Sequence, residues 1–218
     1  WTGGGEHFSF FNQPFAAEIN FQMFCSSLQP LLLKNKKDLE KLEQIKNDFS
    51  KLMKQEMKVM WAKKLGLEKY DETLTNELFN LMVISKSDFT IFFRKLSHIP
   101  ENISFLKEST YLPPTDELDK KWNIWLKKWH YYINKNSNSR EISKSMKKVN
   151  PNFTWREWMI VPSYEEAEKG NYSKIKELQT IFNNPYEEHS LEIEQQYNRL
   201  KPIQFFNNGG ISHYSCSS

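Results

Sequence analysis

The chain has 218 residues, with 30 basic and 27 acidic side chains, a formal net charge of +3 and a pI of about 8.6. This length allows one sizeable core or two small ones, and the balanced charge lacks the basic stripe of a nucleic-acid-binding protein. No apolar run approaches the roughly 18 residues of a membrane span, and two cysteines and seven glycines give no disulfide framework, zinc pattern or phosphate-binding loop.

The first fourteen residues are predicted to be irregular. Three successive glycines at 3–5 do not hold regular structure, and the rings of Phe8, Phe10 and Phe11 need a surface on which to pack. The chain does not begin with methionine, so we expect it to start inside a longer protein or after a cleavage. We therefore interpret residues 1–14 as the end of a segment whose partner lies upstream.

Two long helices are predicted next, over residues 14–33 and 38–64. Pro14 suits the first turn of the first helix. Its lone Cys25 is interpreted as a small buried hydrophobe and not as a nucleophile. The second helix combines an apolar stripe with charged side chains on its solvent side, and Gly66 ends it. The apolar positions of the first helix include Phe15, Ile19, Met23 and Leu28.

The stretch from Ser87 to Ser97 is predicted to be a short amphipathic helix at the centre of the core. Ser87 supplies a capping hydroxyl, and Asp88 places negative charge in the first turn. A preceding helix over residues 73–85 carries the same apolar spacing, so the two are expected to form an antiparallel pair. The apolar face of the short helix comprises Phe89, Phe92, Phe93 and Leu96.

A loop over residues 99–114 is followed by a predicted helix that begins at Thr115 and Asp116. Tryptophan and lysine alternate between its two sides, a combination found in single-strand nucleic-acid binding. We favour the simpler interpretation, an amphipathic helix whose lysines extend to solvent. His130 has no second histidine at ligand spacing, so no metal site is expected there. The alternating residues are Trp122, Trp125 and Trp129 against Lys120, Lys121, Lys127 and Lys128.

The last third is predicted to hold short helices separated by clear breaks. The breaks are a polar segment at 134–139, the Asn150-Pro151 step, a glycine stop at Gly170 and the turn at 183–185. Pro162 is expected to interrupt the helix that Thr154 opens, and the remainder after residue 185 is expected to be loop-rich. No stretch alternates like a strand, so the predicted class is all-α, with strands expected at most in the N-terminal loop.

Several short sequence blocks follow one another along the chain. Each block alone is weak evidence for a family, but their order and spacing together are specific. They are Asn12-Gln13-Pro14, Lys64-Leu65-Gly66-Leu67, Glu77-Leu78-Phe79, Ser87-Asp88-Phe89-Thr90, Phe93-Arg94-Lys95-Leu96-Ser97, Val149-Asn150-Pro151 with Arg156, Ala167-Glu168-Lys169-Gly170, Asn184-Pro185-Tyr186 and Ser215-Cys216-Ser217-Ser218. With these blocks the chain resembles, over nearly its whole length, the C-terminal half of the selenoprotein O family. These are the YdiU-type protein adenylyltransferases, which have a protein-kinase-like fold.

The resemblance implies transfer of AMP from ATP to Ser, Thr or Tyr hydroxyls of proteins, with ATP and Mg²⁺ bound upstream of this chain. The family's catalytic, nucleotide-binding and metal-binding residues lie in the N-terminal half, so none is assigned here, and the chain alone is expected to be inactive. The implied partners are the N-terminal lobe of the same protein and protein substrates, with no nucleic acid and no membrane. The implied location is mitochondrial in a eukaryote and cytoplasmic in a bacterium.

The same resemblance implies a division of the chain into three parts. Residues 1–14 end an active-site segment, residues 15–200 form a helical part of the C-lobe, and residues 201–218 form a flexible tail. Cys216 occupies the family's position for selenocysteine or cysteine, which implies a redox role through a cysteine upstream of the chain. Cys25 is not expected to be its partner, and a plain surface thiol is the alternative.

The sequence departs from the family pattern at several positions, and these departures lead to further expectations. Glu6-His7-Phe8 stands where the family has Gly-Arg-Tyr, which removes an arginine near the active-site segment. Val161-Pro162 replaces residues that favour a helix, so a kink is expected there. Arg94 and Arg156 keep the pattern, although Glu157 follows Arg156 in place of asparagine. We interpret both arginines as structural ion-pair partners and not as catalysts.

Two other functions stay open at this point. The chain could be a stand-alone helical interaction module without enzymatic activity, whose N-terminal aromatic side chains bind a partner protein. A thiol oxidoreductase built on Cys216 is a weaker idea, because no second cysteine lies nearby as in a C-x-x-C motif.

Overall fold

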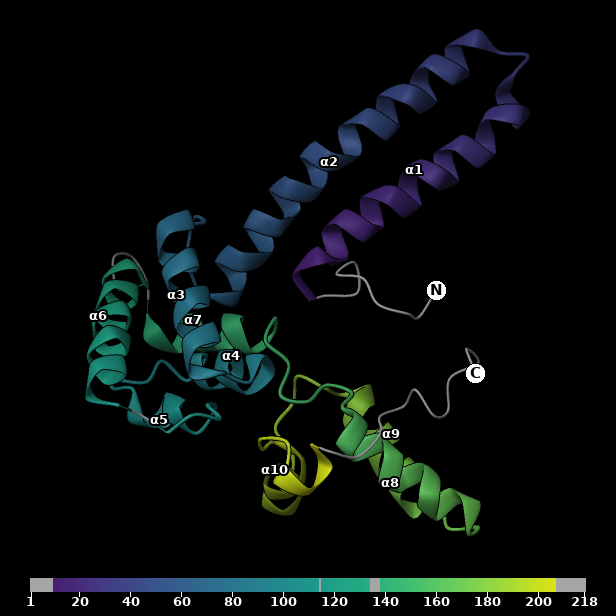
Figure 1. Cartoon of the computed structure of the whole chain (residues 1–218). Helices are drawn as coiled ribbons and strands as arrows, with labels where there is room; N and C mark the ends of the chain where they lie inside the picture. Colours follow the sequence, from purple (N-terminus) through teal and green to yellow (C-terminus); the bar gives the residue numbers. More distant parts are fainter. Residues whose placement is uncertain (1–9, 114, 134–137, 207–218) are drawn as a thin grey trace. The chain divides into compact units, whose positions relative to one another are not determined.

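The computed structural model describes residues 10–113, 115–133 and 138–206 (Figure 1). Within these ranges every regular element is a helix, and the β-type pairing is limited to an isolated antiparallel bridge between Ser87 and Thr110. The all-α prediction is confirmed for the described part of the chain. None of its helices is both long and apolar enough to cross a membrane. The chain divides into two compact units, Trp1–Met60 and Trp61–Ser218.

The first unit is a hairpin of two long helices, which Figure 1 draws in purple and blue. A 3-10 turn, η2 (Phe10–Asn12), leads into α1 (Gln13–Leu32), and α2 (Lys36–Lys64) returns. The predicted irregular segment is therefore wrong for residues 10–13. Phe21 and Phe49 stack between the helices with ring centroids 4.4 Å apart. Gln29 Nε2 donates to Glu43 Oε1 at 2.7 Å.

The second unit starts with the last turn of α2 and continues through five helices. They are α3 (Glu72–Ser85), α4 (Phe89–Leu96), α5 (Ser104–Lys107), α6 (Asp116–Ile133) and α7 (Ser139–Lys147). The closest packing of α3 is along α6, and α4 lies against α5. The expected antiparallel pairing of α3 with α4 at the centre is therefore wrong. Likewise α5 lies inside the stretch at 99–114 that was predicted to be a loop.

Aromatic rings fill the space between α4 and α6. The ring of Phe92 lies 5.3 Å from Trp122, and those of Trp125 and Trp129 stack at 6.2 Å. Both indoles of the stacked pair also donate to buried carbonyls: Trp125 Nε1 to Leu74 O at 2.9 Å, and Trp129 Nε1 to Leu65 O at 2.8 Å. Apolar burial and satisfied indole N–H groups together explain why these tryptophans sit in the core.

The rest of the second unit holds α8 (Glu157–Glu168), α9 (Ser173–Asn183), α10 (Leu191–Tyr197) and η3 (Ile203–Phe205). Helix α10 contradicts the expectation of a loop-rich remainder. Its start is fixed by Ser190, whose Oγ accepts from Ile193 N at 3.4 Å. These elements share one apolar cluster, formed by Phe153, Trp158, Met159, Leu178, Ile181 and Tyr197.

Two helix starts differ from their predicted positions. Asp88, not Ser87, caps α4, because its Oδ1 accepts from Ile91 N at 3.1 Å. Helix α8 begins at Glu157, three residues after Thr154, and it runs through Pro162 to Glu168. The predicted interruption at Pro162 is therefore wrong. Proline removes a single hydrogen bond there, which the packed helix tolerates.

Candidate functional site

The redox candidate Cys216 and the Glu6-His7-Phe8 departure lie outside the described residues. Cys25 is described: it is a free thiol, 1% exposed, inside the α1–α2 hairpin. The prediction that Cys25 is a small buried hydrophobe is confirmed. Such a side chain is shielded from substrates and oxidants.

The tryptophan–lysine helix α6 separates its two residue types by burial. Trp122, Trp125 and Trp129 are buried, whereas the four lysines are exposed. A base cannot stack on a buried ring, so the amphipathic interpretation is confirmed. Lys128 Nζ donates to both carboxylate oxygens of Glu77 at 2.8 Å, which ties α6 to α3.

His130 lies on the last turn of α6, and its imidazole contacts a backbone carbonyl. Its Nε2 lies 2.9 Å from Pro100 O. Throughout the described ranges, no group of three or more His, Cys, Asp or Glu side chains could hold a metal ion.

Arg94 is the most heavily bonded side chain of the second unit. Its Nη1 donates to the carbonyls of Lys147 and Asn150 at 3.3 Å and of Tyr186 at 3.1 Å. Lys147 ends α7, so Arg94 satisfies a carbonyl that the helix leaves without a donor. Arg94 Nη2 also lies 3.5 Å from Glu188 Oε1. The side chain is buried, and burial lowers the pKa of its guanidinium while Glu188 opposes the change.

Asn150, whose backbone carbonyl accepts from Arg94, also makes contacts through its side chain. Its Nδ2 donates to Lys64 O at 2.8 Å and to Ser97 Oγ at 2.9 Å, which closes the C-terminal end of α2 onto α4. The Asn150 side chain is fully buried, and its Oδ1 lacks a hydrogen-bond partner among the described atoms. The residue thus acts as a hydrogen-bonding bracket between two helix ends.

Lys64 is buried at the end of α2 and faces aromatic rings. Its Nζ lies 5.0 Å from the ring centroid of Phe93 and 5.5 Å from that of Phe89, and it donates to Val149 O at 3.4 Å. The lysine is 8% exposed, and desolvation lowers its pKa from 10.5 to about 8. A cation in such surroundings is held by ring faces and one carbonyl.

Arg156 and Asp88 form the second arginine contact. Arg156 Nη2 donates to Asp88 Oδ1 at 2.7 Å, and Nη1 donates to Oδ2 in the same bidentate pair. Asp88 therefore caps α4 and binds the residue that precedes α8. The prediction that Arg94 and Arg156 are ion-pair partners is confirmed by their contacts with Glu188 and Asp88.

A hollow of about 930 Å³ lies beside the end of α2 and the start of α3. Its rim carries both signs of charge, with Lys63, Lys69 and Lys148 alongside Glu68 and Asp71. Bound phosphates need a concentrated positive clamp and a metal ion. The buried cations Lys64 and Arg94 contact backbone carbonyls at and just after the end of α7.

Comparison with known proteins identifies the family. The family model described as protein adenylyltransferase SelO matches residues 3–183. The chain belongs to the SelO family. It is 27% identical to a protein nucleotidyltransferase YdiU of Aromatoleum aromaticum, over 100% of this chain and 43% of that protein. A YdiU of Flavobacterium johnsoniae is 28% identical over 98% of this chain and 42% of its own length. A third, from Brevibacillus brevis, is 31% identical over 82% and 36%.

The chain thus spans less than half the length of these relatives, which carry the name of a nucleotidyltransferase. Two of the sequence blocks that resemble the SelO family contain residues whose contacts are described above. The Lys64-to-Leu67 block holds the buried lysine and the carbonyl that Trp129 binds, and Arg94 lies in the block of α4. These two blocks therefore contribute to contacts between different helices of the second unit.

Sequence reasoning missed two of these residues. Lys64 was placed at a helix end without its burial, and Asn150 was interpreted only as a helix stop. No local signal indicated the side-chain contacts of Asn150, because Lys64 O and Ser97 Oγ are 86 and 53 residues away along the chain. The burial of Lys64 had no local signal either, since it depends on rings contributed by α4.

Proposed function

We propose that this chain is the C-terminal, helical part of a protein adenylyltransferase with a kinase-like fold, which transfers AMP from ATP to Ser, Thr or Tyr hydroxyls of other proteins. The supporting observation is the pattern of coverage. Proteins named protein nucleotidyltransferase YdiU match 98–100% of this chain with only 42–43% of their own length. The proposed partners are the remainder of the same polypeptide and the substrate proteins.

In this reaction the substrate hydroxyl oxygen attacks the α-phosphorus of ATP. A new oxygen–phosphorus bond forms, the bond from that phosphorus to the oxygen that bridges to the β-phosphate breaks, and pyrophosphate leaves. The hydroxyl proton passes to a base. We assign the metal, the nucleotide and the base to the remainder of the polypeptide.

The task of this chain would be to hold the C-lobe rigid. Transfer between two bound reactants depends on positioning, and small displacements lower the rate steeply. Arg94 and Asn150 lock the ends of α7 and α2, and Arg156 locks the start of α8 onto α4. These contacts are the physical means by which a scaffold of helices stays in one arrangement.

The test compares the protein from the complete reading frame with the 218-residue chain. Each is incubated with a divalent metal, a mixture of candidate substrate proteins and ATP labelled either on the α- or on the γ-phosphate. We expect protein-bound label from α-labelled ATP alone, in the complete protein alone. Label from γ-labelled ATP would show a kinase. Label from neither would favour the interaction module, for which the exposed apolar side chains of α1 would supply the surface.

A further part of the proposal is redox control through Cys216. In the complete protein, Cys216→Ser is expected to abolish the change of AMP transfer on mild oxidation while leaving the reduced activity unchanged. Cys25→Ser is the matched control, since a buried thiol does not meet the oxidant. An oxidant response that persists in Cys216→Ser would remove this role.

A further inference from the structure

Helix α1 is unusual because it is almost uncharged and exposes several large apolar side chains. Between Gln13 and Leu32 it has one charged residue, Glu18. Phe15, Ile19 and Met23 follow one another at intervals of four residues, which places them along one side of a helix. We call these three residues the outer strip. They are 61%, 44% and 69% exposed, respectively.

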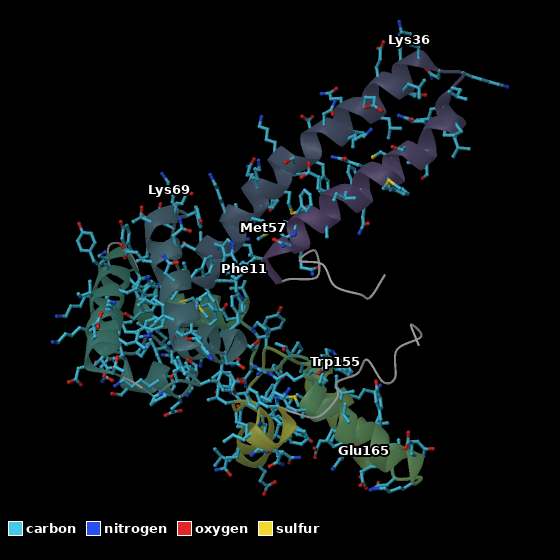
Figure 2. The ribbon with its side chains drawn as sticks, in the orientation of Figure 1. Phe11, Lys36, Met57, Lys69, Trp155 and Glu165 are labelled. Carbon is cyan, nitrogen blue, oxygen red and sulfur yellow. The ribbon has the colours of Figure 1, made fainter. Side chains whose placement is uncertain are left out.

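A different side of α1 faces α2. Phe21 stacks on Phe49, Cys25 is buried, and Gln29 bonds to Glu43. These inner residues share a helical face, because 21, 25 and 29 also recur at intervals of four. At 100° per residue, the outer strip is turned by about 120° from that face. Figure 2 shows side chains leaving α1 away from α2 as well as toward it.

The outward side of α2 provides the comparison within the same hairpin. It carries Glu40, Asn47, Lys51, Lys54 and Lys58, all exposed. That pattern is typical of a helix that meets water. The outer strip of α1 consists of exposed large apolar side chains and is bordered by the uncharged polar residues Gln22 and Ser26. A group of exposed large apolar side chains is typical of a surface that contacts other protein.

The hairpin also buries very little. Of residues 11–60, whose burial is described, only Cys25 and Leu42 are buried. Helices in proteins gain most of their stability from packing an apolar face, and two small contacts of this kind do not supply a core. Covering the exposed apolar side chains of α1 with further protein would therefore stabilise the hairpin.

We propose that the outer strip is an interior surface of the complete protein, covered by an apolar helical face from the part of the polypeptide that lies outside this chain. The occupant follows from length and chemistry. The curated relatives devote more than half of their length to sequence outside the match, and an uncharged strip of large side chains fits a permanent contact better than a transient one. This inference rests on the proposed function, which assigns such a remainder to the protein.

Thiol labelling tests the proposal. Ile19→Cys and Met23→Cys are made separately in a background of Cys25→Ala and Cys216→Ser, and Lys54→Cys on the charged side of α2 is the matched control. Each is labelled with a maleimide in the 218-residue chain and in the protein from the complete reading frame. We expect strip and control thiols to react at similar rates in the 218-residue chain. In the complete protein the strip thiols should react at least tenfold more slowly than the control, because they then require local opening.

Each other outcome overturns the proposal. Equal rates in the complete protein would leave the strip open to solvent. Slow labelling of the strip in the 218-residue chain would mean that the chain covers itself, or that a second copy does so if the rate depends on concentration. Helical content by circular dichroism verifies that each variant folds, and two strip positions guard against the failure of one. A protected strip without AMP transfer would overturn only the proposed function.

Discussion

At position 66, both the backbone conformation and the neighbouring side chains disfavour any residue larger than glycine. Its φ is +66°, and a Cβ there would lie 2.7 Å from both Ile142 Cγ2 and Met146 Sδ. Gly66→Ala is therefore expected to destabilise the second unit by roughly 2–4 kcal/mol, from left-handed strain plus overpacking. Gly170→Ala is the control: its φ is +83°, but nothing lies within 4 Å of the added carbon, so only about 1 kcal/mol of strain applies.

The measurement is denaturant unfolding followed by tryptophan fluorescence. The described tryptophans all belong to the second unit, so the signal follows that unit. Equal losses of stability in the two alanine variants would show that the packing of α7 against Gly66 is loose.

Lys64 gives the second unit a specific dependence on pH. Its folded pKa of about 8 is below the unfolded value of 10.5, so between these values the unfolded chain binds more protons. The Lys64 contribution to stability therefore rises as pH increases from about 8 to 10.5. Lys64→Met removes a buried cation and is expected to raise the free energy of unfolding at pH 7 by about 1–3 kcal/mol. That gain should shrink as the pH rises from about 8 to 10.5.

Urea unfolding at pH 7 and pH 10.5 measures the effect, and Lys63→Met, at an exposed neighbouring position, should change little at either pH. A loss of stability in Lys64→Met at pH 7 would mean that the contacts with Phe93 and Val149 outweigh the cost of burial.

At the scale of elements, Asp88 joins two helices through two different interactions. Asp88→Asn keeps an oxygen that accepts from Ile91 N and caps α4, but it removes the charge that Arg156 needs. The expected cost is about 2–4 kcal/mol, because the guanidinium is left in a mostly buried site without its counter-ion. Asp88→Ala should cost about 1 kcal/mol more, since the cap is also lost.

A double-mutant cycle with Arg156→Gln, followed by thermal unfolding, checks the assignment. If Asp88→Asn had the same effect with and without Arg156, the ion pair would not be the cause.

The long helices could be predicted from sequence because each combines a long apolar period with clear ends. Residues 14–33, 38–64 and 73–85 match α1, α2 and α3 within two residues at each end. The short helices α5 and α10, of four and seven residues, do not complete enough turns to show a period. Only the capping Ser190 marked the second of them.

Packing partners and buried polar contacts were not predictable in the same way. The pairing of α3 with α6 joins segments far apart in the chain, and the contacts of Arg94 join α4 to carbonyls more than fifty residues away. Apolar spacing identifies a face but not what covers it. The ion-pairing interpretation of both arginines was nevertheless possible from the family pattern, and their contacts with Glu188 and Asp88 agree with it.

At the scale of the whole molecule, the two units differ in how much they bury. The second unit has an aromatic core with indole N–H groups bonded to carbonyls, whereas the described part of the first unit buries only two side chains. Local unfolding free energy follows buried apolar contact. In the 218-residue chain, the amides of α1 are therefore expected to exchange with solvent at least a hundredfold faster than those of α6.

Hydrogen–deuterium exchange by mass spectrometry measures this directly, and α3 serves as a second reference from the well-packed unit. The same comparison links stability to the proposed role of the chain, because a scaffold that positions reactants requires an ordered hairpin. In the complete protein the exchange of α1 should slow toward that of α6, as the outer strip becomes covered. Equal protection of α1 and α6 in the 218-residue chain would show that the hairpin is stable without additional protein, and the interaction module would then become the stronger hypothesis.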